Sequence, residues 1–435
     1  MKVEVECAQG ELKRSKEGPR PRGGPGTGWR RTLPAGLMAL ILLMVAFPSA
    51  GEAQGYFPGA HPDWERREPA EVGFDPDALQ DAIELAIASE SEAPRDLRLN
   101  HDMTFGREPR GEAIGPFGDR GPQTGLVIRH GYIVAEWGEP ARVDQTFSIA
   151  KSFLSTTVGI AVDEGVIRSV DDRVGDYMPP IVLEHGDGEP GDQDGRRPKL
   201  LFESEHNRRI TWDHLLRQTS DWEGTLWGKP EWADRPDRDP STWLTRPRNE
   251  PGTVYEYNDT RVNLLALAAT AVWRKPLAEV LHERVMAPIG ASTTWQWHGY
   301  ENSWINLNGH RVQVVSGGSH WGGGMFINAY DQARLGLLTL HEGRWGNRRI
   351  VSEDWVDRSR VPGSANSGYG FMNYFLNTDG EMYPSAPEEA WAHRGAGANI
   401  VYVDPVHDLV VVTRWIQGSA FDAVIEHVLA ALDEG

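Results

Sequence analysis

The stretch Phe147-Ser148-Ile149-Ala150-Lys151-Ser152 opens an apolar segment with helical periodicity that runs over residues 148–164. Residues three apart at the start of a helix face the same way, so the ammonium group of Lys151 can lie beside the hydroxyl group of Ser148. A serine hydroxyl is a poor nucleophile until a neighbour takes its proton, and a buried lysine with a lowered pKa can do so. The spacing therefore predicts an activated serine, although a serine here could equally be a helix N-cap.

A second candidate segment ends in Tyr257-Asn258-Asp259 and leads into a predicted helix over residues 258–273. A tyrosine held beside a lysine can shuttle a proton between a nucleophile and its leaving group, and an adjacent amide can orient the lysine. The alternative is a tyrosine that packs into the core where a helix begins. The segment alone leaves both interpretations open.

The third candidate segment is His393-Arg394-Gly395-Ala396-Gly397, which leads into a predicted hairpin near the end of the chain. Glycines before a strand let a substrate lie close to the backbone. The N–H group of Ala396 could then pair with that of Ser148 to hold an oxyanion. A plain turn at the entry to a strand is the alternative.

Predicted β-hairpins lie at both ends of the chain, at residues 124–137 and 399–416, and helical periodicity marks most of the region between them. Helices are expected at residues 75–89, 148–164, 211–217, 258–273, 276–286 and 420–432. This order predicts an α+β fold, in which an antiparallel β-sheet is flanked by helices and carries a mostly helical inserted domain. We expect a sheet domain from residues 54–165 and 300–435, a helical domain from residues 166–299, and an active site at their junction.

The three segments occur in the order S-x-x-K, Y-x-(N) and (K/H)-x-G, and this order resembles the β-lactamase-like serine hydrolases. That family includes class C β-lactamases, penicillin-binding D,D-peptidases, D-aminopeptidases, family VIII esterases and 6-aminohexanoate-dimer hydrolases. The resemblance runs from about residue 120 to 430. It includes further blocks at residues 163–172, 210–220, 321–325 and 367–370.

The resemblance implies a role for each segment. Ser148 would be the acylated nucleophile, Lys151 its general base and Tyr257 the proton shuttle. Residues 393–396 would form the strand that lines the pocket. A β-lactamase/transpeptidase-like fold is implied as well.

Two positions depart from the family pattern. Asp259 stands where the family usually has Asn, so both Asn258 and Asp259 are candidates for the orienting and substrate-binding role. His393 stands where class C β-lactamases have a lysine that helps to hold the substrate carboxylate. With Gly395 and Ala396 it forms the expected substrate-binding and oxyanion segment. The histidine favours an esterase or amidase over an efficient β-lactamase.

The predicted function is hydrolysis of an ester or amide bond through an acyl-Ser148 intermediate, with a small molecule or peptide as substrate. The alternative is a penicillin-binding or cell-wall peptide-binding protein, or a D,D-peptidase-like enzyme, with little turnover. Motifs of metalloproteases, P-loop proteins and dinucleotide-binding proteins do not occur, so we expect no metal and no cofactor. The oligomeric state stays open.

The N-terminal region predicts export. Residues 35–47 are apolar, follow Arg30-Arg31 and precede small residues at 48–53, so residues 1–53 are expected to be a signal peptide region for a periplasmic or secreted protein. An uncleaved signal that anchors the protein is the alternative, although 13 apolar residues are short for a stable membrane span. The only cysteine, Cys7, lies before this run, so the rest of the chain can form no disulfide.

Acidic residues dominate the remainder. Without residues 1–53 the chain has 36 Lys and Arg against 58 Asp and Glu, which gives a net charge of −22. Such a charge disfavours nucleic-acid partners. Ten of the 17 tryptophans fall between Trp212 and Trp321, which indicates either an aromatic-walled substrate cleft or anchors that hold long loops to the core.

Overall fold

The computed structural model describes residues 55–183 and 198–432. The predicted signal region, residues 1–53, lies outside these ranges. The described residues belong to one compact unit. The predicted α+β fold with antiparallel sheets and helices is confirmed. The division of this unit into a sheet domain and an inserted helical domain stays a prediction.

The main sheet has six antiparallel strands in the order β13-β14-β15-β16-β1-β2. Both predicted hairpins are part of it. The strands are β1 (Thr124–Arg129), β2 (Tyr132–Trp137), β13 (Phe375–Leu376), β14 (Trp391–Gly395), β15 (Asn399–Asp404) and β16 (Leu409–Arg414).

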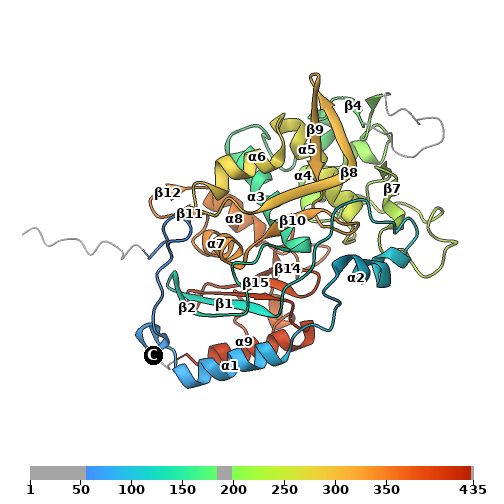
Figure 1. Cartoon of the computed structure of the whole chain (residues 1–435). Coiled ribbons are helices and arrows are strands. Elements are labelled where there is room, and N and C mark those ends of the chain that lie inside the picture. The colour runs from blue at the N-terminus through green and yellow to red at the C-terminus, as the bar shows by residue number, and fades with distance from the viewer. Residues whose placement is uncertain (1–54, 184–197, 433–435) are drawn as a thin grey trace, which may run out of the picture. The chain divides into compact units, whose positions relative to one another are not determined.

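Helices cover both faces of this sheet, and the alternation of side chains along each strand decides which face each residue joins (Figure 1). Val127 and Val411, which are paired in register, pack with helices α1 (Pro76–Ala88) and α9 (Phe421–Ala430). The adjacent pair Leu126 and Val412 belongs to the larger core on the other face, which includes helices α3 (Ala150–Asp163) and α7 (Ala329–Leu340).

A second antiparallel sheet has the order β3-β10-β8-β9. Its strands are β3 (Asp144–Gln145), β8 (Gln296–Leu307), β9 (His310–Val315) and β10 (Gly324–Ile327). Three short two-stranded pairs are β4 (Ile181–Val182) with β5 (Pro198–Lys199), β6 (Thr225–Leu226) with β7 (Lys229–Pro230), and β11 (Arg344–Trp345) with β12 (Arg348–Arg349). The other α-helices are α2 (Leu97–Met103), α4 (Trp212–Leu216), α5 (Asp259–Trp273), α6 (Leu277–Leu281) and α8 (Glu353–Ser359).

Local sequence signals explain several boundaries. Helix α1 begins after Asp75, whose carboxylate accepts hydrogen bonds from the N–H groups of Asp77 and Ala78. The turn between β1 and β2 consists of His130 and Gly131, and both have positive φ (53° and 84°), as a two-residue hairpin turn of type I′ requires. Within the described ranges, none of the helices has the length and hydrophobicity that a bilayer span needs.

The fold brings the three candidate segments together. Strand β3 leads into a short 3-10 turn, Phe147–Ile149, which continues directly into α3. Helix α5 packs against α3, and the end of β14 lies beside the 3-10 turn. Segments that are more than 100 residues apart in the chain therefore meet at the start of α3.

Candidate active site

Ser148 and Lys151 lie together at the start of α3, as their spacing predicts. The side-chain nitrogen of Lys151 donates a hydrogen bond of 2.9 Å to Oγ of Ser148. Lys151 has no exposed surface, and Ser148 retains 9%. Phe147, directly before the serine, has a φ of 49°, which is a strained conformation for a bulky residue and one that occurs often at functional sites. In this geometry the amine of Lys151, when neutral, could take a proton from Ser148.

Asp259 takes the position beside the lysine that sequence reasoning left open. Its Oδ1 lies 2.5 Å from Nζ of Lys151. Asn258 instead caps helix α5: its side chain accepts a hydrogen bond from the N–H group of Arg261 (3.1 Å) and donates one to the carbonyl of Glu231 (2.7 Å). Asp259 therefore orients the lysine, and Asn258 is used within the fold.

The pair of buried charges changes the expected chemistry of the lysine. Burial by itself would lower the pKa of Lys151, but the carboxylate of Asp259 outweighs it and raises this pKa above its ordinary value. The pKa of Asp259 is held below its ordinary range, because Lys151 and Arg235 outweigh the effect of burial. The expectation of a lysine with a lowered pKa is thus wrong, since a carboxylate stands where the family usually has a neutral amide.

The ring of Tyr257 lies close to two cations. The ammonium group of Lys151 is 4.8 Å from the centre of its ring, and the guanidinium carbon of Arg235 is 5.0 Å from it. The side chain of Tyr257 is partly exposed. A phenol in this place can contact both the buried lysine and a bound substrate.

The end of strand β14 approaches Ser148 closely at Gly395. A Cβ atom on this residue would lie 2.2 Å from the carbonyl oxygen of Thr146 and 3.2 Å from the backbone nitrogen of Ser148, so only glycine fits. The pairing of Ala396 with Ser148 in an oxyanion hole stays a prediction. Ala396 is the residue directly after Gly395, where the backbone comes close to Ser148.

His393 is placed differently from the expectation that it offers a group to the substrate. Its side chain has no exposed surface, its Nδ1 donates to the carbonyl of Asn373 (3.3 Å), and its ring packs edge-on against Tyr374. Burial lowers the pKa of His393 to about 4, so the ring is neutral near pH 7. The side chain of His393 therefore packs in the core beneath strand β14. It provides no positive charge for a substrate carboxylate.

Gly318, in the loop before β10, belongs to the site although sequence reasoning missed it. A Cβ atom there would lie 2.1 Å from Nζ of Lys151 and 2.2 Å from Oδ1 of Asp259. The loop therefore passes directly over this ion pair, and glycine is required for that passage. The doublet Gly317-Gly318 was the available signal, but a glycine pair is also common in ordinary turns.

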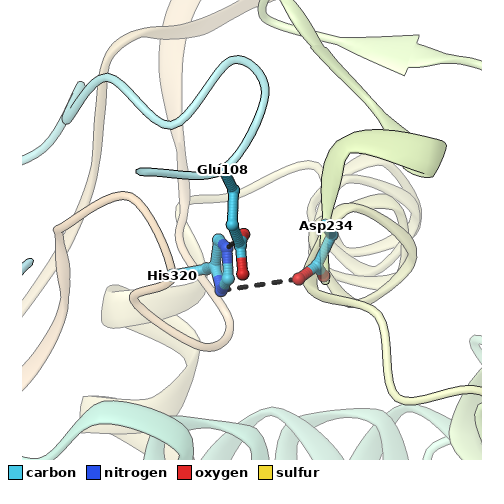
Figure 2. A group of neighbouring side chains, drawn as sticks. All are labelled: Glu108, Asp234 and His320. Carbon is cyan, nitrogen blue, oxygen red and sulfur yellow. Dashed lines mark hydrogen bonds and ion pairs between the residues drawn. The ribbon is translucent and has the colours of Figure 1, made fainter. Parts of the chain in front are cut away.

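Two further missed residues surround the carboxylate of Asp259. Its Oδ2 lies 3.5 Å from Nη2 of Arg235 and 3.7 Å from Nδ1 of His320. His320 in turn lies between Glu108, which is 2.7 Å from Nε2, and Asp234, which is 3.4 Å from Nδ1 (Figure 2). Sequence spacing does not connect Glu108, the adjacent residues Asp234 and Arg235, and His320, because they come from three loops that are distant in the chain.

The carboxylate and imidazole atoms of Glu108, Asp234 and His320 lie within 4.8 Å of one another, which is close enough for a metal site. However, Asp234 already pairs with the guanidinium group of Arg235 at 2.5 Å. A metal ion bound here would face this cation at close range. The residues fit a network of mutually compensating charges better than a set of metal ligands.

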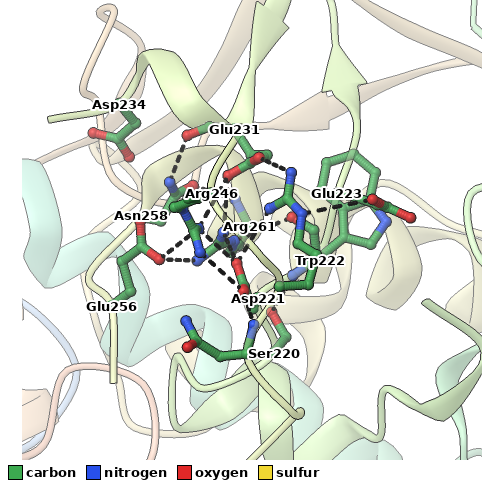
Figure 3. Close-up of polar contacts among 12 residues, drawn as sticks. Ser220, Asp221, Trp222, Glu223, Glu231, Asp234, Arg246, Glu256, Asn258 and Arg261 are labelled. Atoms are coloured by element: carbon green, nitrogen blue, oxygen red, sulfur yellow. Dashed lines mark hydrogen bonds and ion pairs between the residues drawn. The ribbon is translucent and has the colours of Figure 1, made fainter. Parts of the chain in front are cut away.

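A second buried network holds the loops beside α5. Arg261 pairs with Asp221 (2.6 Å) and Glu231 (2.8 Å), and all three side chains are at most 3% exposed (Figure 3). Arg246 and Arg248 add further pairs to the same carboxylates. The ion pairs hold the loop at its two carboxylates, Asp221 and Glu231. Asp234 and Arg235 lie a few residues further along the same segment.

Residues 126–417 match the sequence model of the Beta-lactamase family. The chain belongs to the Beta-lactamase family. This match covers all three segments at the site. The resemblance inferred from the motif order is thereby confirmed.

Known members of the Beta-lactamase family and their structural relatives include hydrolases. The 6-aminohexanoate-dimer hydrolase of Paenarthrobacter ureafaciens is 25% identical over 264 residues, which are 58% of this chain and 60% of that protein. The chain therefore spans less than two thirds of the length of this relative. A penicillin-binding protein homologue from Caulobacter crescentus has a TM-score of 0.52 at 14% identity and covers 83% of this chain and 99% of its own. A family VIII carboxylesterase has a TM-score of 0.50 at 16% identity, with 82% and 97% covered. These two likenesses show the fold.

The tryptophans of this Beta-lactamase family member differ in burial. Trp212, Trp222 and Trp321 are fully buried and anchor loops to the core. Trp232 and Trp243 are only partly buried and stack on each other, with ring centres 5.5 Å apart.

Proposed function

We propose that this protein is a serine hydrolase that cleaves an ester or amide bond of a small molecule or peptide through an acyl-Ser148 intermediate. The hydrogen bond of 2.9 Å between Lys151 and Ser148 carries the proposal, because it joins a nucleophile to a buried proton-transfer group at the start of a helix. Membership of a family with hydrolase relatives supports it.

The first step needs a neutral lysine. Oγ of Ser148 attacks the carbonyl carbon while its proton passes to Lys151, and Tyr257 transfers a proton to the leaving group. Water then attacks the acyl-Ser148 ester and restores the serine. Since Asp259 favours the charged form of Lys151, the neutral form becomes more populated as pH rises. We therefore expect the rate to increase from neutral to alkaline pH.

The expected substrate preference follows from the side chain at position 393, which carries no positive charge near pH 7. A buried, neutral His393 cannot hold a substrate carboxylate as a lysine would. We therefore expect a nitrophenyl ester to be hydrolysed faster than a chromogenic cephalosporin, which carries such a carboxylate. We also expect it to be hydrolysed faster than a D-amino acid amide, whose nitrogen is a poorer leaving group than a nitrophenolate. A cephalosporin rate that exceeds the other two would contradict this ranking.

Labelling with a fluorophosphonate, which reacts with activated serines, tests the proposed nucleophile. We expect the unmodified protein to be labelled and Ser148→Ala to stay unlabelled. Ser155→Ala is a matched control, because Ser155 is buried on the same helix and its hydroxyl has no hydrogen-bond partner. Equal labelling of all three proteins would refute the proposal.

The raised pKa of Lys151 also favours a second candidate, a penicillin-binding or cell-wall peptide-binding protein that is acylated but turns over slowly. Both candidates need Ser148. Pre-steady-state kinetics separate them, because a stoichiometric burst without a following steady rate indicates the binding protein. For either candidate we propose export by the signal pattern of residues 1–53.

A further inference from the structure

A pocket with aromatic walls lies next to Tyr257 and is not used by the chemistry described above. Its volume is ≈ 360 Å³. Trp232 and Trp243 line it with their rings 17° from parallel, and Tyr255 adds a third aromatic wall. Ordinary small-molecule sites combine such apolar walls with a few polar groups.

Arg235 connects this pocket to the catalytic lysine. It lines the pocket, and its Nη2 lies 3.5 Å from one oxygen of the Asp259 carboxylate, while Lys151 lies 2.5 Å from the other oxygen. The ring of Tyr257 contacts both cations. A single carboxylate and a single ring therefore separate the pocket wall from the buried lysine.

The two arginines in the wall already have carboxylate partners, whereas the carboxylate of Asp237, also in the wall, accepts a hydrogen bond from the N–H group of Asp239. Arg235 pairs with Asp234 at 2.5 Å. Arg246 pairs with Asp221 at 2.7 Å and with Glu256 at 3.1 Å. Because these guanidinium groups are compensated, an anionic ligand would have to break existing ion pairs. The sides of Trp232 and Trp243 that do not face each other, together with Tyr255, remain for binding, and they suit a flat, uncharged ring.

The position of the pocket indicates which part of the substrate it receives. Gly395 of strand β14 brings the backbone close to the nitrogen of Ser148, on the side where we expect the carbonyl oxygen. Tyr257, the proposed proton donor to the leaving group, contacts Arg235 of the pocket wall. A leaving group that receives its proton from Tyr257 therefore points toward the pocket.

We propose that the pocket lined by Trp232, Trp243 and Tyr255 binds the leaving group of the substrate and selects an uncharged ring, as in an aryl ester. This rests on the proposed function. In the reaction, the new bond joins Oγ of Ser148 to the carbonyl carbon, and the bond to the leaving-group oxygen breaks. That oxygen takes up the proton lost by the serine, so a neutral hydroxyl compound departs.

Two acetate esters with different leaving groups test the proposal, because the acyl group stays the same. For Trp243→Ala and Trp232→Ala we expect kcat/KM for 1-naphthyl acetate to fall about tenfold, which corresponds to loss of one ring contact and its buried area. For ethyl acetate we expect kcat/KM within about twofold of the unmodified protein, because the small group does not fill the pocket. Trp304→Ala is the matched control, since Trp304 is a partly exposed tryptophan covered by Arg311 on the β8-β9 hairpin.

Equal losses for both esters, or no loss for the naphthyl ester, would overturn the proposal. A second measurement avoids variants: 1-naphthol should inhibit hydrolysis of ethyl acetate by the unmodified protein competitively, and an absence of inhibition would also overturn it. Fluorophosphonate labelling distinguishes failure of the leaving-group proposal from failure of the proposed hydrolase function. If Ser148 is labelled but the ester ratio does not change, only the leaving-group site is refuted, whereas absence of labelling refutes the hydrolase itself.

Discussion

The side-chain nitrogen of Lys151 lies 2.5 Å from the carboxylate of Asp259, and neither side chain is more than 1% exposed. In this pair the carboxylate stabilises the charged lysine, whereas an amide at the same position would orient it without adding a charge. In the proposed mechanism, the pair therefore sets the pH at which the lysine can accept the proton of Ser148. Arg235 and His320 complete the surroundings of the carboxylate.

Asp259→Asn should move the acidic limb of the pH profile of kcat/KM to lower pH. Asp259 raises the pKa of Lys151, so its removal lowers that pKa and makes the neutral lysine available at a lower pH. An opposite charge at this distance typically shifts a pKa by about 1–3 units. Asp213→Asn, which changes a partly exposed carboxylate paired with Arg217, should leave the limb in place. An unmoved limb in Asp259→Asn would mean that Lys151 is not the base.

Gly318→Ala should abolish most activity without unfolding the protein. The added methyl group would lie 2.1 Å from Nζ of Lys151 and must displace the Lys151–Asp259 pair. Displacement of catalytic groups by about 1 Å can cost about 100-fold in rate, and we expect a loss in kcat/KM of at least this order. Gly418→Ala is the control, because nothing lies within 4 Å of the added atom. Near-normal kinetics of Gly318→Ala would contradict the close passage of this loop.

Arg261→Met should destabilise the fold by up to about 3–5 kcal/mol, because it removes the fully buried cation of Asp221 and Glu231 and leaves these carboxylates only the partly exposed Arg246 and Arg248. Urea unfolding measures this change. Arg284→Met, which breaks an exposed pair with Glu164, should cost no more than about 1 kcal/mol. Similar values for the two variants would show that the network in Figure 3 contributes little.

His393 should make the protein less stable in acid. Its pKa is about 4 in the folded state, against about 6.5 in an unfolded chain. The unfolded state therefore binds more protons, and the free energy of unfolding falls as pH decreases from about 6.5 to about 4, by about 3 kcal/mol in total. In His393→Gln this part of the pH dependence should be missing. Urea unfolding at pH 7.5 and pH 4.5 would show a smaller difference for the variant, and identical differences would refute the assignment.

Much of the secondary structure could be predicted because its signals are local. The cap at Asp75, the turn at His130 and Gly131, and the apolar periodicity of α3 and α5 all lie within a few residues of the elements they define. His393 shows the limit of such reasoning. Its motif position suggested contact with substrate, but the packing of β14 decides that its ring faces the core.

The sequence by itself determined the pairing of Ser148 with Lys151, because residues three apart at the start of a helix share a face whatever surrounds them. The tertiary structure alone decided what surrounds that pair. Asp259 rather than Asn258 reaches the lysine because Asn258 is occupied as the cap of α5, and Gly318, Arg235 and His320 arrive on loops distant in the chain. Such contacts depend on how whole elements pack, and no short spacing encodes them. They set the proton affinity of the lysine, and with it the chemistry that Ser148 can perform.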